Sequence, residues 1–383
     1  MNTLRLRRIA LRGVQAVLGA LACVLVILVA TWMWAGGATA GLVGVSRMLW
    51  HGNTTVYDFR LYPSRPLLAS TMPAPFKQRA AAAPPALAQQ LASTDSLAFL
   101  VVQDDAIVYE WYAAGHGAAS MSQFFSVSKS ILSTLVGMAI DDGLIRSIDQ
   151  PVTDYVPELA PAGFSRVTLR HLVNMSSGMA YEENDNPFGL HVLMNYTADL
   201  PKVILDFKLS GVPGAHYEYK SGDNALLSLV LQRAVAPLSL TAYAQRRLWT
   251  PLGMESPGLW SLDREGGMEK AWCCIAGTAR DLAKLGRLYL GNGPLNSQRL
   301  LSRQWVDQAT HLPSGPGGGR VYGFSWWPAS PTGTDVMAVG KDGQFLYIDP
   351  SHNTLVVRLG RSNGGLGIPQ WAALFRQMSE HPW

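Results

Sequence analysis

Length, composition and charge exclude several classes of protein. The chain has 383 residues, of which 48% are hydrophobic and 15% charged, and its formal net charge is +4. Four arginines lie within the first twelve residues, ahead of the first acidic residue, Asp58, so the remainder of the chain is electrically neutral. A neutral body argues against a nucleic-acid-binding protein, and the apolar content argues against a disordered chain. The length allows one large domain or two lobes around a sizeable core.

The N-terminal segment predicts a membrane anchor. No charged residue occurs between Arg12 and Arg47, and residues 20–30 are almost wholly Leu, Val, Ile and Ala. About 20 apolar residues span a bilayer core, and the preceding arginines favour a cytoplasmic N-terminus. We therefore expect residues 1–35 to form a transmembrane signal anchor in the inner membrane, with the rest of the chain in the periplasm. The alternative is a signal peptide cleaved near Ala40, after Ala38-Thr39-Ala40.

The three cysteines do not indicate a disulfide framework. Cys23 lies in the apolar segment, and Cys273 and Cys274 are adjacent in sequence. Neighbouring cysteines rarely bridge each other without backbone strain. We therefore interpret Cys273 and Cys274 as two small buried apolar residues.

In chain order, residues 36–85 are rich in proline and predict a linker, and residues 86–383 predict the main domain. Residues 97–102 and 107–112 predict a β-hairpin, and 126–142 a buried helix. Residues 145–310 predict a mainly helical lobe, with the clearest helical patterns at 226–234, 242–249 and 278–290. Four strands follow at 322–327, 336–339, 344–348 and 354–359, and a last helix at 369–380. This order predicts an α+β fold, in which helices flank an antiparallel sheet formed from both chain ends.

The motifs of several other enzyme classes are absent from the sequence. It contains no His-Glu-x-x-His, no P-loop, no Gly-x-Gly-x-x-Gly and no Gly-x-Ser-x-Gly, and its eight histidines lack metal-ligand spacing. We therefore expect no metal and no cofactor.

A Ser-x-x-Lys motif lies at the start of the helix predicted at 126–142. Ser126 and Lys129 are three residues apart, so their side chains share one helix face. A lysine amine kept neutral by burial at a helix N-terminus can take the proton of a serine hydroxyl. Because the motif arises by chance in a chain of this length, by itself it favours an N-cap serine with a surface lysine.

Two later segments give this motif its context. Residues 213–221 form a turn that leads to Tyr219, and Gly340-Lys341-Asp342-Gly343-Gln344 places a Lys-x-Gly before a strand. With the three segments in this order, the chain resembles the serine β-lactamase and penicillin-binding-protein superfamily. It is most similar to the class C-like esterase and 6-aminohexanoate-dimer hydrolase branch. The resemblance begins near residue 54 and includes 167–178, 251–254, 278–283 and 322–327.

The resemblance implies roles for residues of this sequence. Ser126 matches the nucleophile, Lys129 its base, and Tyr219 the tyrosine that exchanges protons with the lysine; we expect nearby ammonium groups to lower the pKa of this phenol. The backbone N–H groups of Ser126 and Gln344 match an oxyanion hole. The residues assigned to substrate binding are Lys341, Gly343, Ser221 and Trp327.

Two departures from the superfamily pattern bear on the substrate. Ser221 stands where asparagine is usual, and Asp342 replaces the threonine of Lys-Thr-Gly. Both changes point away from a true β-lactamase. Glu182, Glu183 and Asp185 we interpret as a solvated charge cluster.

These observations predict a serine hydrolase that cleaves ester or amide bonds of small substrates through an acyl-enzyme on Ser126. One alternative is a D-Ala-D-Ala peptidase or β-lactamase acting on peptidoglycan-like substrates. A second is a non-catalytic sensor or binding domain on the same scaffold. The expected partners are a small ester or amide and the lipid bilayer, with no nucleic acid.

Overall fold

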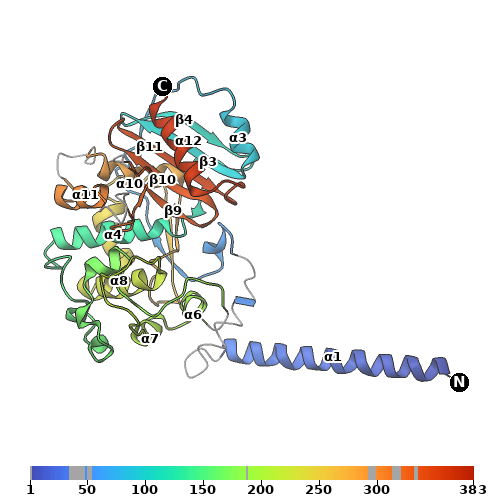
Figure 1. The fold of residues 1–383 in the computed structure, drawn as a ribbon. Helices are drawn as coiled ribbons and strands as arrows, with labels where there is room; N and C mark the ends of the chain where they lie inside the picture. The colour runs from blue at the N-terminus through green and yellow to red at the C-terminus, as the bar shows by residue number, and fades with distance from the viewer. Residues whose placement is uncertain are drawn as a thin grey trace.

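The N-terminal helix stands apart from the rest of the molecule. A computed structural model of the chain describes residues 2–33, 48–49, 54–186, 189–291, 299–312, 321–331 and 335–383. Helix α1 (Asn2–Met33) extends away from the body, as Figure 1 shows. Its stretch Arg12–Ala30 is exposed, and it is long and apolar enough to cross a membrane or to serve as a signal sequence. The cleavage motif near Ala40 lies outside the described residues.

The main sheet is built from both ends of the body. Its strand order is β2-β4-β3-β11-β10-β9-β8, and every neighbouring pair is antiparallel except β2 and β4. The strands are β2 (Lys77–Gln78), β3 (Ser96–Gln103), β4 (Ala106–Tyr112), β8 (Trp327–Pro328), β9 (Val336–Gly340), β10 (Gln344–Asp349) and β11 (Thr354–Gly360). The hairpin and the last three strands occur where the sequence places them. The antiparallel sheet from both chain ends is therefore confirmed.

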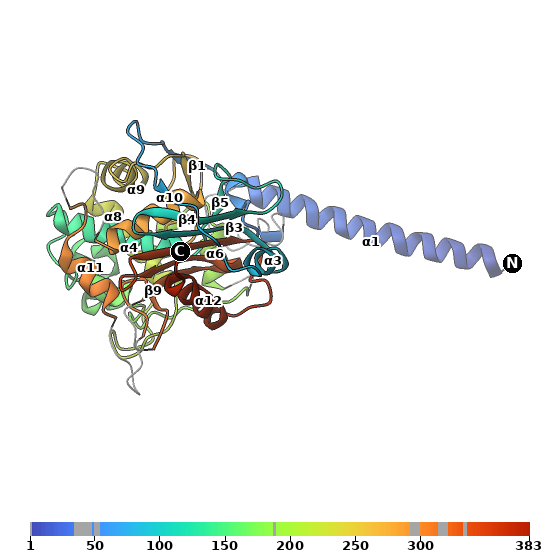
Figure 2. The same ribbon diagram turned by 90° about the horizontal axis from the view of Figure 1, so that it is seen from above.

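Both faces of this sheet are covered, which explains why its strands read as continuous apolar runs. Helix α12 (Ile368–Glu380) lies against one face and α10 (Ala279–Tyr289) against the other (Figure 2). Along β3, Phe99 and Val101 pack under α12, whereas Leu100 and Val102 join the core beneath α10 and α4 (Val127–Asp141). This alternation follows from the two-residue period of a strand.

The helical lobe lies on the far side of α4 from the sheet, so α4 is enclosed between the two halves of the body (Figure 1). Its helices include α8 (Ser221–Ala234), which contacts α4, and the neighbouring α5, α6 and α7. The remaining α-helices are α3 (Leu87–Ser93), α5 (Leu169–Val173), α6 (Leu190–Tyr196), α7 (Leu200–Leu205), α9 (Leu240–Ala244) and α11 (Arg303–Thr310). Short 3₁₀ segments occur at Asp58–Arg60, Val152–Asp154, Pro157–Ala162, Phe164–Arg166 and Lys341–Gly343, and α9 continues as a π-helix, Gln245–Trp249. The predicted α+β class, with an inserted helical lobe, is confirmed.

The segment expected to be a linker is in part integrated into the body. Strand β1 (Ser64–Leu67) pairs with β6 (Gly258–Ser261), and β2 pairs with β4 of the main sheet. A second sheet has the order β1-β6-β7-β5, with β5 (Ser122–Gln123) and β7 (Ile275–Gly277). Strands of two to four residues are too short to leave a periodic signal, so this sheet was not predicted.

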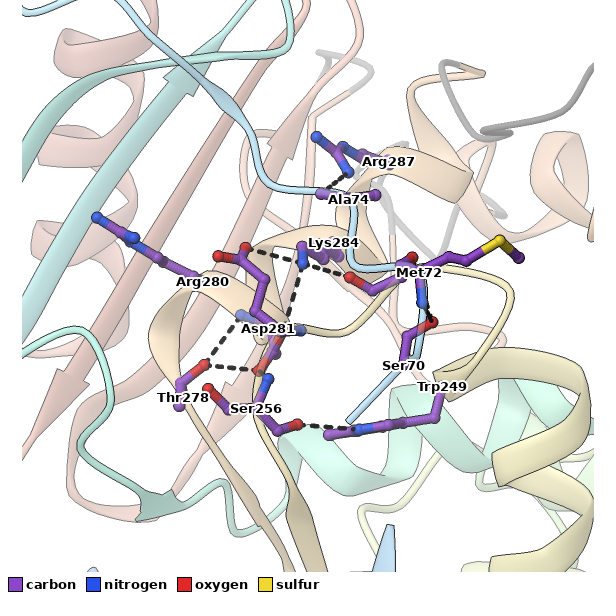
Figure 3. Close-up of polar contacts among 12 residues, drawn as sticks. Ser70, Met72, Ala74, Trp249, Ser256, Thr278, Arg280, Asp281, Lys284 and Arg287 are labelled. Atoms are coloured by element: carbon purple, nitrogen blue, oxygen red, sulfur yellow. Dashed lines mark hydrogen bonds and ion pairs between the residues drawn. The ribbon is translucent and has the colours of Figure 1, made fainter. Parts of the chain in front are cut away.

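A buried polar network fastens the same segment to α10 (Figure 3). Arg287 donates to the carbonyl oxygen of Ala74 at 2.9 Å, and its guanidinium carbon lies 3.8 Å from the centre of the Phe76 ring. The amine of Lys284 donates to the Gly253 carbonyl at 2.6 Å and pairs with Glu255 at 2.8 Å. Residues 70–76 are thereby held against the helix that supports the sheet.

The strand predicted at 322–327 is mostly a tight turn. Phe324 and Ser325 have φ values of 50° and 64°, which lie in the left-handed region, and an isolated bridge joins Gly323 to Trp326. Only Trp327 and Pro328 continue as strand β8. The Ser133 hydroxyl donates to the Phe324 carbonyl at 2.8 Å, so α4 helps to fix the turn. The aromatic and β-branched pattern in this stretch reflects burial of side chains in a turn.

Candidate active site

Ser126 lies at a sharp change of direction between β5 and α4. Phe125 has a φ of 47°, an uncommon value for a bulky residue, and it turns the chain from the short strand into the helix. Ser126 is the N-cap of α4, and its carbonyl accepts from the Lys129 N–H at 3.0 Å. In the part of the chain that the structure describes, no acceptor is hydrogen-bonded to the Ser126 backbone N–H. The serine is therefore presented at a helix N-terminus that can accept negative charge.

Lys129 and Ser126 are brought together as the sequence predicts. The Lys129 amine lies 2.9 Å from the Ser126 hydroxyl oxygen, and it also donates to the Trp272 carbonyl at 2.9 Å. The lysine is 1% exposed. Burial lowers the pKa of Lys129 to about 8, although the charge of Glu183 acts in the opposite direction. A substantial fraction of the amine is thus neutral near physiological pH, and its lone pair can accept the serine proton.

Tyr219 completes the predicted group, but the pKa of its phenol differs from our expectation. The Lys129 amine is 5.1 Å from the centre of the Tyr219 ring, which packs against Trp327 at 5.7 Å and Tyr322 at 6.1 Å between ring centres. Burial raises the pKa of Tyr219, and the charge of Glu183 raises it further, whereas a hydrogen bond with the Ser126 side chain lowers it. The expectation that ammonium groups lower this pKa was wrong, because burial of the phenol, which disfavours the charged phenolate, has the largest effect.

The start of β10 lies beside the nucleophile loop. A Cβ on Gly340 would come within 2.4 Å of the Phe124 carbonyl oxygen, so only glycine allows β9 to approach the residues before Ser126 so closely. Gln344 pairs with Gly340 and is completely buried. Its side-chain amide donates to the carbonyls of Lys341 and Gly360 at 3.2 and 2.8 Å, which fixes the first residue of β10. The oxyanion role of the Gln344 N–H remains a prediction.

The residues assigned to substrate binding fall into two groups. Lys341 lines the same cavity as Ser126, and its amine donates to the Thr54 hydroxyl. Gly343 instead faces the core: its φ is 74°, and its carbonyl accepts from Arg358 at 2.7 Å. Trp327 packs on Tyr219, and neither it nor Gly343 is among the described residues that line the cavity. The structure therefore brings Lys341 to the site directly and the other two only at a distance.

Ser221 is hydrogen-bonded to Glu183, whose role differs from the one expected from the sequence. Ser221 donates to the Glu183 carboxylate through its N–H at 2.7 Å and through its hydroxyl at 2.5 Å. The Glu183 side chain is 28% exposed and lies 3.6 Å from His191. Its pKa falls to about 2, because hydrogen bonds and charges from His191, Lys129 and Ser221 outweigh burial. Glu183 thus supplies a fixed negative charge to the site, and the interpretation of a solvated cluster was wrong for this residue. No local pattern distinguishes it from Glu182.

The interpretation of Cys273 and Cys274 also needs correction. The two residues form a disulfide with each other, with Cα atoms 3.7 Å apart. Cys274 is buried and Cys273 is partly exposed. Both line the cavity that contains Ser126, so the pair belongs to the site.

This cavity has a volume of about 330 Å³ and lies between the sheet and the helical lobe. Its wall combines the nucleophile loop, helix α6, the turn that carries the disulfide, and the segment that follows the N-terminal helix. The lining residues are Met48, Thr54, Asp58, Tyr62, Gln123, Phe125, Ser126, Glu183, Asn184, Asp185, His191, Val192, Asn195, Tyr196, Ser221, Lys270, Trp272, Cys273, Cys274 and Lys341. A pocket of this size accommodates a small organic substrate next to the serine.

Comparison with known proteins agrees with the fold. The beta-lactamase family model matches residues 85–375. The 6-aminohexanoate-dimer hydrolase of Paenarthrobacter ureafaciens is 28% identical over 303 residues, which cover 72% of this chain and 75% of that protein. Among solved structures, a candidate 6-aminohexanoate-dimer hydrolase from Bacillus anthracis has a TM-score of 0.72 at 20% identity and covers 86% of this chain and 94% of that chain. A class C beta-lactamase has a TM-score of 0.58 at 18% identity, with coverages of 78% and 94%. The resemblance inferred from the three motifs is confirmed.

Proposed function

This chain belongs to the beta-lactamase family, and we propose that it is a serine hydrolase that cleaves ester or amide bonds through an acyl-enzyme on Ser126. The observation that carries the proposal is the 2.9 Å separation between the Lys129 amine and the hydroxyl of Ser126, a residue that lines the cavity. A serine hydroxyl is a weak nucleophile until an adjacent base removes its proton. Lys129 is placed to be that base.

The proposed reaction has two stages. Neutral Lys129 accepts the hydroxyl proton as the Ser126 oxygen attacks the substrate carbonyl carbon, and the carbonyl oxygen becomes an oxyanion near the N–H groups of Ser126 and Gln344. The tetrahedral intermediate collapses and expels an alcohol or amine, which takes its proton from Tyr219; the Lys129 ammonium reprotonates the tyrosine. Water then attacks the acyl-enzyme with the same groups acting in reverse, and the acid product leaves.

The two pKa values decide how Lys129 and Tyr219 divide the work. The Lys129 pKa of about 8 makes the neutral amine available, whereas the raised pKa of Tyr219 keeps the phenol protonated. A protonated phenol beside the nucleophile is suited to donate a proton. These values support Lys129 as the base that activates Ser126 and Tyr219 as the acid for the leaving group.

The relative from Paenarthrobacter ureafaciens supports an amide substrate, because 6-aminohexanoate dimer hydrolysis is the activity in its name. The small cavity supports a small acyl group. Two features of the residues themselves stand against a β-lactam: Asp342 in place of threonine, and Ser221, whose hydroxyl is engaged by Glu183.

We also propose that α1 is an uncleaved anchor and that the catalytic body faces away from the cytoplasm. The arginine-rich N-terminus ahead of the apolar stretch supports this orientation. Membrane fractionation, combined with digestion by a protease added outside sealed membrane vesicles, tests this orientation. Release of a soluble form beginning near residue 41 indicates a cleaved signal peptide instead.

Activity profiling tests the catalytic proposal. Full-length protein in detergent should hydrolyse at least one member of a panel of short-chain nitrophenyl esters and aliphatic amides, and Ser126→Ala should abolish this hydrolysis. A fluorophosphonate probe should label Ser126 in the folded wild-type protein. Unchanged hydrolysis in Ser126→Ala contradicts the proposal, and absence of both hydrolysis and labelling supports a non-catalytic domain. Stable labelling by a fluorescent penicillin supports the peptidase or β-lactamase alternative.

A further inference from the structure

The turn that carries the disulfide joins the nucleophile loop to the wall of the cavity. The Cys274 N–H donates to the Lys270 carbonyl at 3.1 Å and closes a turn over residues 270–274. The next residue, Ile275, begins β7, and its carbonyl accepts from the Phe124 N–H at 2.8 Å. Phe124 lies two residues before Ser126. A movement of this turn therefore shifts Ser126 through one backbone hydrogen bond and a few residues of chain.

Within the turn, Trp272 supplies a hydrogen-bond partner of the Lys129 amine, in addition to Ser126. Its carbonyl accepts from Lys129 at 2.9 Å, and its indole N–H donates to the Asn195 side chain at 3.1 Å. Trp272 is almost fully buried. The indole is held by α6, so the direction of the carbonyl depends on the backbone between Trp272 and the next residues.

The disulfide acts on that backbone. The S–S bond between Cys273 and Cys274 closes a small ring that includes the peptide link between the two cysteines, one residue after the Trp272 carbonyl. A disulfide stabilises a fold chiefly by closing a long loop in the unfolded chain, and the stabilisation grows with loop length. A bridge between adjacent residues closes almost no loop, so its effect is local and falls on the turn.

We propose that the Cys273–Cys274 disulfide is a positioning element for Lys129, and that a dithiol reductant which opens it slows acylation of Ser126. The inference rests on the proposed serine-hydrolase function. Once the ring is open, the backbone around the Cys273–Cys274 peptide link regains torsional freedom. The turn then holds the neighbouring Trp272 carbonyl less firmly, and the carbonyl no longer keeps the amine at one position beside the serine. Misplacement of a catalytic group by about 1 Å can cost roughly 100-fold in rate.

The chemistry needs only a dithiol. A thiolate of the reductant attacks the sulfur of Cys273, which is the more exposed of the pair, and the bond to Cys274 breaks with its electron pair on the Cys274 sulfur. The second thiol of the reductant then displaces Cys273 and becomes part of a cyclic disulfide. The two cysteine thiolates take up two protons. The reductant is oxidised by two electrons, and the protein is reduced by two.

The test compares oxidised and reduced full-length protein. Thiol titration after denaturation without reductant should find one thiol, Cys23, and three after treatment with dithiothreitol. Reduction should lower kcat for an ester substrate by about tenfold or more, change KM less than threefold, and slow fluorophosphonate labelling of Ser126 to a similar extent. Reoxidation should restore kcat, KM and the rate of fluorophosphonate labelling. The double variant Cys273→Ala/Cys274→Ala should resemble the reduced enzyme and ignore the reductant, whereas Cys23→Ser should respond like the wild type.

Three results overturn the inference. The first is three free thiols in protein that was never reduced. The second is an unchanged kcat after complete reduction. The third is a change in KM alone, which makes the disulfide a wall of the pocket and nothing more. Absence of hydrolysis and of labelling in the oxidised protein removes the proposed function itself and is thus distinguishable from these results. A melting temperature for each form shows whether the fold survives reduction.

Discussion

The Lys129 amine lies 2.9 Å from the Ser126 hydroxyl oxygen at the first turn of α4, and the lysine is only 1% exposed to solvent. The two residues come from one helix, but the burial comes from elsewhere, because the sheet, α8 and the turn containing Trp272 enclose that end of α4. Burial of an amine is expensive unless the charge is compensated or lost. Here the lowered pKa of Lys129 turns that cost into a base next to a nucleophile.

Lys129→Met should remove activity without a loss of stability. We expect kcat/KM to fall by about 10²–10⁴-fold, which is the usual contribution of a general base. The melting temperature should stay the same or rise, because an apolar side chain of similar length fits a buried site better than an amine. Esterase assays and thermal denaturation measure the two effects. Lys202→Met on the exposed surface of α7 should change neither, and more than a tenth of wild-type activity in Lys129→Met contradicts the assignment.

The pH dependence should report on the charge of Glu183. In the wild type, kcat/KM should rise with pH through about 8 as Lys129 loses its proton. The Glu183 carboxylate favours the ammonium form and therefore raises the pKa of Lys129, so Glu183→Gln should lower this pKa and move the acidic limb to lower pH. Asp185→Asn, at the exposed rim of the same cavity, should leave the limb in place. An acidic limb that remains at the same pH or moves to higher pH in Glu183→Gln refutes the coupling between Glu183 and Lys129.

Tyr219→Phe should separate the acid from the base. Loss of the phenol proton donor should lower kcat by about 10²–10⁴-fold, while the acidic limb near pH 8 persists, because Lys129 still titrates. The phenyl ring retains the packing on Trp327 and Tyr322, so the melting temperature should change little. Tyr217→Phe, whose ring also packs on Tyr322, serves as the matched control. If the limb near pH 8 disappears with the Tyr219 hydroxyl, the tyrosine is the base.

The buried network of Figure 3 should matter for stability. Lys284 has a fully buried side chain paired with Glu255 and Asp281, so Lys284→Met leaves carboxylates without their cation and should cost about 3–5 kcal/mol in the free energy of unfolding. Arg146, whose side chain is 76% exposed in its pair with Asp154, provides the contrast. Arg146→Met should cost about 1 kcal/mol or less. Urea denaturation measures the free energy of unfolding of both variants. Equal costs would contradict the inference that the buried ion pairs of Lys284 matter more than the exposed pair of Arg146.

Asp223 should make the fold less stable as the pH rises from about 4 to 7. Burial raises the pKa of this carboxyl to about 7 despite hydrogen bonds from Ser177. The unfolded chain releases the proton near pH 4, so between the two values the native state binds more protons and loses stability with increasing pH. In Asp223→Asn this contribution is absent, so between pH 4 and 7 the melting temperature should fall less, or rise more, than in the wild type. Asp206→Asn, at an exposed carboxylate, should keep the wild-type slope.

The sequence alone determined the elements that have a strong local signature. The apolar run of α1, the hairpin of β3 and β4, the strands β9 to β11 and the helix α4 all occur where periodicity places them. The Ser-x-x-Lys spacing determined that Ser126 and Lys129 meet, because residues three apart on a helix share a face. The order of three motifs was enough to identify the family.

Tertiary structure decided what depends on contacts between distant residues. The second sheet joins strands from four parts of the chain, none longer than four residues, so no local pattern marks it. The rise of the Tyr219 pKa results from burial, to which the packing of Tyr322 and Trp327 on its ring contributes. The lowered pKa of Glu183 depends on contacts with Ser221 and His191, which come from other parts of the chain. Adjacency in sequence argued against the Cys273–Cys274 bridge, yet the folded turn brings both sulfurs to the wall of the cavity. Burial and electrostatic environment are properties of the assembled surroundings, and a sequence read locally does not contain them.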